Sequence, residues 1–79
     1  MRIDKYLKVS RLIKRRSVAN EACDSGRIAV NGRPVKASYD VKVGDVIEIT
    51  IGERVNKYEV TDILEHVLKG DAQNLYKPL

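Results

Sequence analysis

The spacing of the hydrophobic residues changes at Gly26, and this change constrains the fold more than any other feature. Before Gly26 the hydrophobic residues recur at the three- and four-residue spacing of an amphipathic helix. After Gly26 they alternate with other residues, which is typical of strands that bury one face. A chain of 79 residues is long enough for one domain. The sequence therefore predicts an α+β fold in which two short N-terminal helices pack on a small, mainly antiparallel sheet.

The first helix is predicted over residues 2–9. Ile3, Tyr6 and Leu7 lie on one face of such a helix and are expected to face the core. The second helix is predicted over residues 18–25. Its apolar stripe consists of Val18, Ala19, Ala22 and Cys23.

Residues at both ends of the second helix favour these limits. The hydroxyl of Ser17 can accept a hydrogen bond from a free backbone N–H, so Ser17 is the expected N-cap. Gly26 suits the left-handed conformation that often ends a helix. Lys14-Arg15-Arg16 precedes the helix and is a dense group of positive charge. A helix start also presents unpaired N–H groups, which favour phosphate.

A β-hairpin is predicted directly after the helices. Asn31-Gly32 separates two short runs of β-type residues, and both residues tolerate a positive φ. The return strand is expected over Arg33–Ala37. Pro34 lacks an N–H for the ladder, so this strand is expected at an edge of the sheet.

Two further strands are predicted over residues 46–51 and 55–63. Turns at 43–45 and at Gly52-Glu53 precede and join them. The side chains expected to face the core from these strands are Ile47, Ile49, Ile51, Tyr58 and Val60.

The pattern is less regular towards the C-terminus. The run from Leu64 to Leu68 suggests a short helix ended by Gly70, and residues 72–79 suggest a tail anchored by Leu75 and Tyr76. We therefore expect a domain over residues 1–64 and a C-terminal extension over residues 65–79.

Positive charge is concentrated in the N-terminal half. Residues 1–36 carry ten basic and three acidic groups, for a net charge of +7, whereas residues 37–79 carry five and eight, for −3. Such asymmetry is typical of a face that binds a polyanion. Charge that served solubility alone would be interspersed. The basic segment lacks the bulky apolar face of a membrane-surface helix, so nucleic acid is the favoured partner.

The sequence offers little for catalysis or for metal binding. One cysteine and one histidine, Cys23 and His66, are too few for a zinc site or for a nucleophile with a base and a third group. Cys23 is interpreted as a core thiol. Asp4 has no second acid at a useful spacing, and we expect it to balance Lys8 or Arg11 or to lie near the positive end of the helix dipole. We therefore expect no enzyme activity, no cofactor and no metal.

Ten basic residues are the candidate RNA-binding residues. Arginine can bind phosphate through a planar fork and can stack on bases. Tyr39 is a further candidate for stacking, whereas Tyr6 and Tyr58 fit core positions. The predicted RNA-binding set is Arg2, Lys5, Lys8, Arg11, Lys14, Arg15, Arg16, Arg27, Arg33 and Lys36.

The order of these features resembles the S-four-type RNA-binding domain. The matching segments are residues 2–7, 10–11, 14–19, 26–32, 35–36, 38 and 44–47. Within that superfamily the chain is similar to the short stand-alone proteins. These are the ribosome quality-control factors of the RqcP (YabO) type and the fifteen-kilodalton heat-shock RNA-binding proteins, which carry a longer basic C-terminal extension.

The resemblance to the RqcP type implies a specific role. Such a protein binds large ribosomal subunits obstructed by a peptidyl-tRNA and contacts tRNA and large-subunit rRNA there. It supports the C-terminal alanine tailing of stalled nascent chains with its partner RqcH. The resemblance favours Arg2, Arg11, Arg15, Arg16 and Lys36 most directly as RNA contacts.

Three alternatives stay open at this point. The protein could be a heat-shock-type ribosome recycling factor, a detached RNA-binding domain of an rRNA-modifying enzyme, or a small DNA-binding module. Charge alone does not separate RNA from DNA, because both display phosphate. Since the chain has no long apolar run and no apolar signal segment near Met1, we expect a cytoplasmic monomer without membrane contact.

Overall fold

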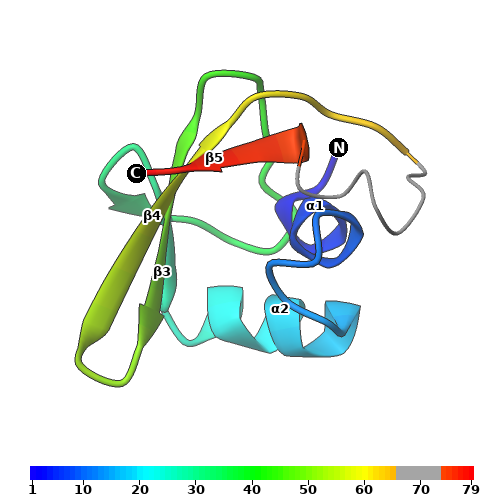
Figure 1. Cartoon of the computed structure of the whole chain (residues 1–79). Coiled ribbons are helices and arrows are strands. Elements are labelled where there is room, and N and C mark those ends of the chain that lie inside the picture. The colour runs from blue at the N-terminus through cyan, green and yellow to red at the C-terminus, as the bar shows by residue number, and fades with distance from the viewer. Residues whose placement is uncertain (66–73) are drawn as a thin grey trace.

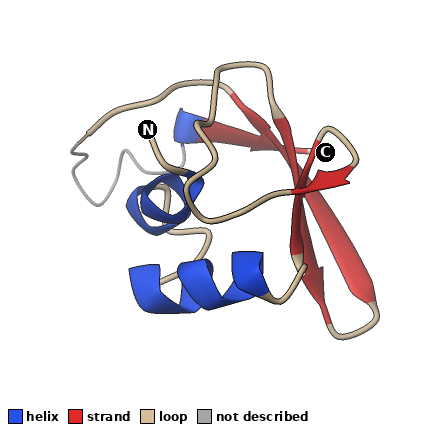
Figure 2. Cartoon of the chain, turned by 180° about the vertical axis from the view of Figure 1, so that it is seen from behind, coloured by secondary structure: helices blue, strands red, loops and turns tan. Residues whose placement is uncertain are grey.

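Two helices and five strands form the described part of the protein. The structure is a computed structural model, and it describes residues 1–65 and 74–79. The elements in chain order are α1 Ile3–Val9, α2 Arg16–Asp24, β1 Ile28–Val30, β2 Arg33–Pro34, β3 Val46–Ile51, β4 Arg54–Val60 and β5 Tyr76–Pro78. Figures 1 and 2 show the helices together on one side of the sheet. The predicted fold class is confirmed.

Helix α1 forms because its apolar residues share one face. Ile3, Tyr6 and Leu7 are completely buried, and the helix ends at Val9 as the spacing predicts. Ser10 follows as the C-cap and is also buried. The helix therefore exposes only the side that carries Lys8.

Helix α2 begins earlier than the sequence predicted. Its N-cap is Arg15, whose backbone is extended and whose side chain makes no capping bond. The prediction that Ser17 is the N-cap is wrong, because Ser17 lies inside the first turn. A capping bond stabilises a helix by about 1 kcal/mol, which tertiary contacts can outweigh. Here the earlier start brings Arg16 within reach of a buried carboxylate in α1.

The C-terminal end of α2 agrees with the prediction. Gly26 adopts a φ of +79°, where a side chain would be strained. The Gly26 N–H donates to Cys23 O at 3.1 Å, and the Arg27 N–H donates to Ala22 O at 2.9 Å. This pair of bonds is a Schellman motif, and it turns the chain directly into β1.

The β1–β2 hairpin is also as predicted. Asn31 and Gly32 have φ values of +52° and +84°, which are the positive angles of a type I′ turn. Strand β2 lies at one edge of the sheet, as Pro34 requires. The return strand is shorter than expected because the chain leaves the sheet to run beside α1. There Ala37 O accepts from the Asp4 N–H at 3.3 Å.

All five strands form one antiparallel sheet in the order β2-β1-β3-β4-β5. Ile47 and Ile49 of β3 enter the core, but Ile51 is 64% exposed because it lies near the β3–β4 turn, beyond the helices. Strand β4 ends at Val60 rather than at residue 63. The N–H groups of the next two residues bond Leu75 O and draw the chain out of the ladder.

Strand β5 was not predicted. The sequence suggested a tail there, with Leu75 and Tyr76 as anchors. Leu75 is 1% exposed and its carbonyl accepts from the Tyr6 hydroxyl at 2.6 Å, so the two ends of the described chain meet in the core. Tyr76 packs edge-on against Tyr58. The predicted helix from Leu64 to Gly70 lies largely outside the described residues.

The described residues include no helix that is long and apolar enough to span a bilayer. Within the same ranges, no group of three His, Cys, Asp or Glu side chains is placed to hold a metal ion.

Candidate RNA-binding surface

The connection between α1 and α2 presents basic side chains because its apolar residues are turned inward. Ser10 donates from its hydroxyl to Leu7 O at 3.3 Å, and the Ile13 N–H donates to the same carbonyl at 3.0 Å. Leu12 and Ile13 pack against the core. Lys14 and Arg15 are consequently left exposed on a connection that is fixed at both ends.

Arg11 occupies a strained position on this connection. It follows the C-cap of α1 with a φ of +64°, the left-handed conformation that usually requires glycine at this site. Its N–H donates to Lys8 O at 3.1 Å, and its side chain is exposed. Strain of this kind is concentrated at functional sites, so the position favours a role for the guanidinium.

A buried carboxylate gathers two arginines beside the connection. Asp4 is 2% exposed. Arg2 bonds it through both prongs of its fork, with Nε 3.2 Å from Oδ1 and Nη2 3.3 Å from Oδ2. Arg16 reaches Oδ1 from α2 with Nη2 at 3.4 Å. The Lys5 N–H and the Asn20 amide complete the set of donors.

These contacts differ from the sequence expectation. Asp4 was expected to balance Lys8 or Arg11, but its partners are Arg2 and Arg16; its expected place in the first turn of α1 is confirmed. Burial raises the pKa of Asp4, but the hydrogen bonds from Arg2, Asn20 and Arg16 outweigh this effect, so the pKa lies below its ordinary value. The carboxylate is therefore charged at neutral pH.

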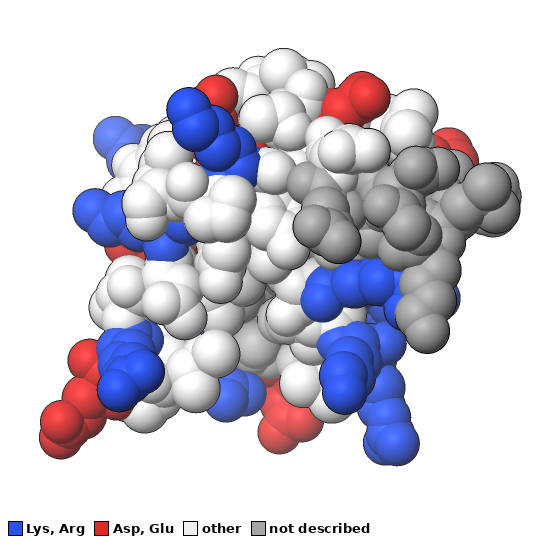
Figure 3. Space-filling view, in the orientation of Figure 1, with Lys and Arg blue, Asp and Glu red and all other residues white. Residues whose placement is uncertain are grey.

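We call Arg2, Arg11, Lys14, Arg15 and Arg16 the basic corner. Figure 3 shows Lys and Arg side chains gathered where α2 begins. Arg11, Lys14 and Arg15 have no ion pair among the described residues, and the side chains of Arg2 and Arg16 stay 51% and 47% exposed beside Asp4. The basic corner can therefore offer N–H donors to an outside anion.

The other candidate residues are placed differently. Lys5 forms an ion pair with Glu65, a residue of the acidic half, so its charge is partly offset. Lys8 is exposed on α1. Figure 1 places the β1–β2 hairpin on the side of the molecule away from the α1–α2 connection. Arg27 and Arg33 belong to this hairpin region and are separate from the basic corner. Lys36 follows β2 and precedes Ala37, whose carbonyl accepts from the Asp4 N–H at 3.3 Å, so it lies nearer to α1. Contact of these three residues with RNA stays a prediction.

Comparison with known proteins identifies the family of the chain that carries this surface. Residues 1–47 match the model of the S4 domain. The chain is 51% identical over 77 residues to the RQC P-site tRNA stabilizing factor of Halalkalibacterium halodurans, covering 98% of this chain and 88% of the relative. It is 47% identical over 76 residues to the factor of that name from Bacillus subtilis, covering 96% and 88%.

The chain belongs to the S4 domain family of RQC P-site tRNA stabilizing factors. The resemblance seen in the sequence is thereby confirmed. The fold also matches the trimeric structure of Heat Shock Protein 15 from Vibrio cholerae, with a TM-score of 0.91 and 29% identity over 100% of this chain and 81% of the other.

The tyrosines of this S4 domain protein serve mainly as packing residues. Tyr6 is completely buried and Tyr58 is half-buried, as their spacing predicts. Tyr39 is half-buried, and its hydroxyl donates to Asp45 Oδ2 at 3.0 Å. The possibility that Tyr39 stacks on a base stays a prediction.

Cys23 of this S4 domain protein is a core residue, as its place on the apolar stripe predicts. It is 4% exposed, and burial, with smaller contributions from the charges of Asp4 and Asp24, raises its pKa to about 11. A thiol with such a pKa is protonated at neutral pH and is a poor nucleophile.

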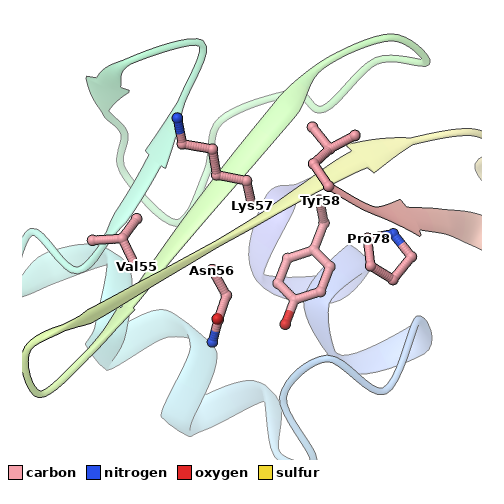
Figure 4. Close-up of a pocket in the computed structure, with 6 residues that line it drawn as sticks. Val55, Asn56, Lys57, Tyr58 and Pro78 are labelled. Atoms are coloured by element: carbon pink, nitrogen blue, oxygen red, sulfur yellow. The ribbon is translucent and has the colours of Figure 1, made fainter.

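One shallow pocket was not predicted from the sequence. It lies on β4 and the C-terminal residues, has a volume of about 230 Å³, and is lined by Val55, Asn56, Lys57, Tyr58, Pro78 and Leu79. Figure 4 shows the Tyr58 and Lys57 side chains pointing to opposite sides of the strand. The lining has a single charged side chain and no pair of acid and base groups.

Proposed function

We propose that this protein is a non-catalytic RNA-binding factor of ribosome quality control that binds rRNA and tRNA on obstructed large ribosomal subunits. The observation that carries this proposal is the 51% identity with an RQC P-site tRNA stabilizing factor over nearly the whole chain. The basic corner supplies a chemical means, because exposed guanidinium groups bind phosphate through charge-assisted hydrogen bonds. The proposal includes a cytoplasmic location, because ribosome quality control acts on cytoplasmic ribosomes.

The binding mode follows from the rigidity of the surface. Helical RNA is recognised mostly through its shape and its phosphates, because its deep groove is too narrow for side chains to read. The backbone of the basic corner is held by two packed helices and a pinned connection, and the side chains of Arg2 and Arg16 are held by Asp4. These two side chains then lose little conformational entropy on binding.

In this proposal the protein acts as a monomer that contacts peptidyl-tRNA and large-subunit rRNA together. A bridge of that kind would hold the peptidyl-tRNA in place while the partner RqcH supplies alanyl-tRNA for C-terminal tailing. The protein would then contribute affinity and position, with the bond-forming chemistry left to the ribosome.

Binding to defined ribosomal particles tests the proposal. We expect tight binding to large subunits that carry peptidyl-tRNA and weaker binding to empty large subunits. Binding to duplex DNA, supplied at the same phosphate concentration, should be the weakest. Affinities should be compared at several salt concentrations, because phosphate contacts weaken with added salt. Equal affinity for all three targets would contradict the proposal and would leave only nonspecific polyanion binding.

A heat-shock-type recycling role is the second candidate, because the fold agrees closely with that of Heat Shock Protein 15. The two roles differ in their dependence on RqcH. Addition of the protein to stalled large subunits with RqcH and alanyl-tRNA should increase alanine tailing if the quality-control role is correct. Release of the peptidyl-tRNA without tailing would favour the recycling role.

A further inference from the structure

Asp4 is the buried charged residue that RNA binding does not explain. A polyanion-binding surface gains nothing in attraction from a carboxylate, yet Asp4 lies between two of the arginines that face the solvent. Its first-turn position in α1 does not require burial or five donors. The arrangement of those donors indicates what the carboxylate does.

Both carboxylate oxygens of Asp4 accept hydrogen bonds from several donors. Oδ1 accepts from Arg2 Nε, Arg16 Nη2 and the Lys5 N–H, while Oδ2 accepts from Arg2 Nη2 and the Asn20 amide. Each guanidinium group therefore uses only some of its N–H groups to bond Asp4. The remaining N–H groups are available to bind another anion. Without the negative charge, two guanidinium groups this close would repel each other.

We infer that Asp4 is a positioning residue that holds Arg2 and Arg16 as a paired clamp for an RNA phosphate. The inference rests on the proposed function and adds a specific role to a residue that does not itself contact RNA. The clamp joins a residue that precedes α1 to the first residue of α2. It thus fixes two long side chains whose rotamer freedom would otherwise be lost only when RNA binds.

Removal of the Asp4 charge should tighten RNA binding if net charge alone matters, and should weaken it if Asp4 positions the arginines. The direction of the change in affinity therefore decides between the two explanations. Asp4→Asn keeps the size of the side chain and raises the net charge from +4 to +5. If charge alone mattered, RNA binding would become tighter. If Asp4 positions the clamp, binding becomes weaker, because an amide nitrogen would face an arginine donor or Asn20 and the guanidinium groups would separate.

The experiment measures binding of wild-type protein and variants to large subunits carrying peptidyl-tRNA. For Asp4→Asn we expect binding about tenfold weaker, as for the loss of one charged hydrogen bond. The slope of log affinity against log salt should fall by about one phosphate contact. A control, Glu21→Gln, removes the same charge from an exposed site on α2 and should bind as tightly as wild type or more tightly.

A second variant keeps the test valid if Asp4→Asn unfolds. Arg16→Lys retains the charge at a site that is 47% exposed, but a single ammonium cannot rest on Asp4 and also reach phosphate with a fork. We expect weaker binding for Arg16→Lys and no change for Arg54→Lys on β4. Tighter or equal binding of folded Asp4→Asn, or unchanged binding of Arg16→Lys, would overturn the positioning role. Failure of the wild-type protein to bind any of the particles would instead overturn the proposed function.

Discussion

Arg11 combines a strained backbone with an exposed side chain. Its backbone holds a left-handed conformation that costs a residue with a Cβ about 1 kcal/mol, and glycine relieves this cost. The side chain gains no ion pair among the described residues that would offset the strain. We therefore propose that the exposed guanidinium serves RNA binding, and substitution of this residue tests the proposal.

Arg11→Gly should stabilise the protein while it weakens RNA binding. We expect the free energy of unfolding in urea to rise by about 0.5–1 kcal/mol, because glycine adopts this φ without strain. Arg11→Ala is the matched control, since it removes the guanidinium and keeps the strain. Both variants should lose affinity for RNA, and only the glycine variant should gain stability. A glycine variant that binds RNA like wild type would exclude Arg11 from the surface.

The charge of Asp4 should also make the fold sensitive to acid. Its pKa is lowered in the folded state, so the ionised form contributes stability above the ordinary pKa of aspartate and loses that contribution as pH falls. We expect the difference in unfolding free energy between wild type and Asp4→Asn to shrink below about pH 4. Urea titrations between neutral and acidic pH measure this difference. A difference that stays constant with pH would contradict the prediction.

Cys23 should report unfolding through its reactivity. Its thiol is buried and its pKa is raised to about 11, so a thiol reagent at neutral pH should modify the native protein slowly. Modification should become fast in denaturing urea. Rapid modification of the native protein would show that the α2 face opens readily.

At the scale of elements, the β1–β2 hairpin and the C-terminal end of α2 were predicted from the sequence, whereas strand β5 was not. Asn31-Gly32 and Gly26 demand particular φ values, and such local demands can be read from a single sequence. Strand β5 depends on pairing with β4 and has only three residues, one of them a proline. Its sequence carries no alternation to detect, so only the tertiary structure reveals it.

Leu75 next to β5 should be a major source of stability. It is 1% exposed and lies where α1 meets the sheet, so Leu75→Ala should reduce the free energy of unfolding by about 2–4 kcal/mol through lost burial and a cavity. Leu79→Ala makes the same chemical change at a residue that is 63% exposed and should have little effect. Urea unfolding measures both variants. Similar losses for the two would refute the core role of Leu75.

At the scale of the whole molecule, charge asymmetry should determine which side meets RNA. Arg15→Ala with Arg16→Ala removes two charges from the basic corner, whereas Arg54→Ala with Lys57→Ala removes two from β4. All four side chains are exposed, and Asp4 keeps its bonds to Arg2, Lys5 and Asn20 when Arg16 is replaced, so both variants should fold, the first with lower stability. The first should bind RNA at least tenfold more weakly and the second should change binding little, apart from long-range attraction. Filter binding at two salt concentrations provides the comparison.

The candidate site was predictable in composition and less so in arrangement. Clustered charges identify Lys14, Arg15 and Arg16 directly from the sequence. The partnership of Asp4 with Arg16 joins residues twelve positions apart and depends on how α1 packs on α2. Likewise, the pairing of Lys5 with Glu65 depends on the path of the later chain around α1. Neither contact follows from local periodicity.

The contact between Tyr6 and Leu75 limits how this domain can be transplanted. Residues 1–47 contain both helices and every residue of the basic corner, so they look sufficient for a graft into another protein. Yet Val60 and Leu75, both beyond that segment, belong to the same buried core as Ile3, Tyr6 and Leu7 of α1. A graft of residues 1–47 would transfer the basic residues without the part of the core that holds their helices in place. A useful chimera must include the whole sheet through β5.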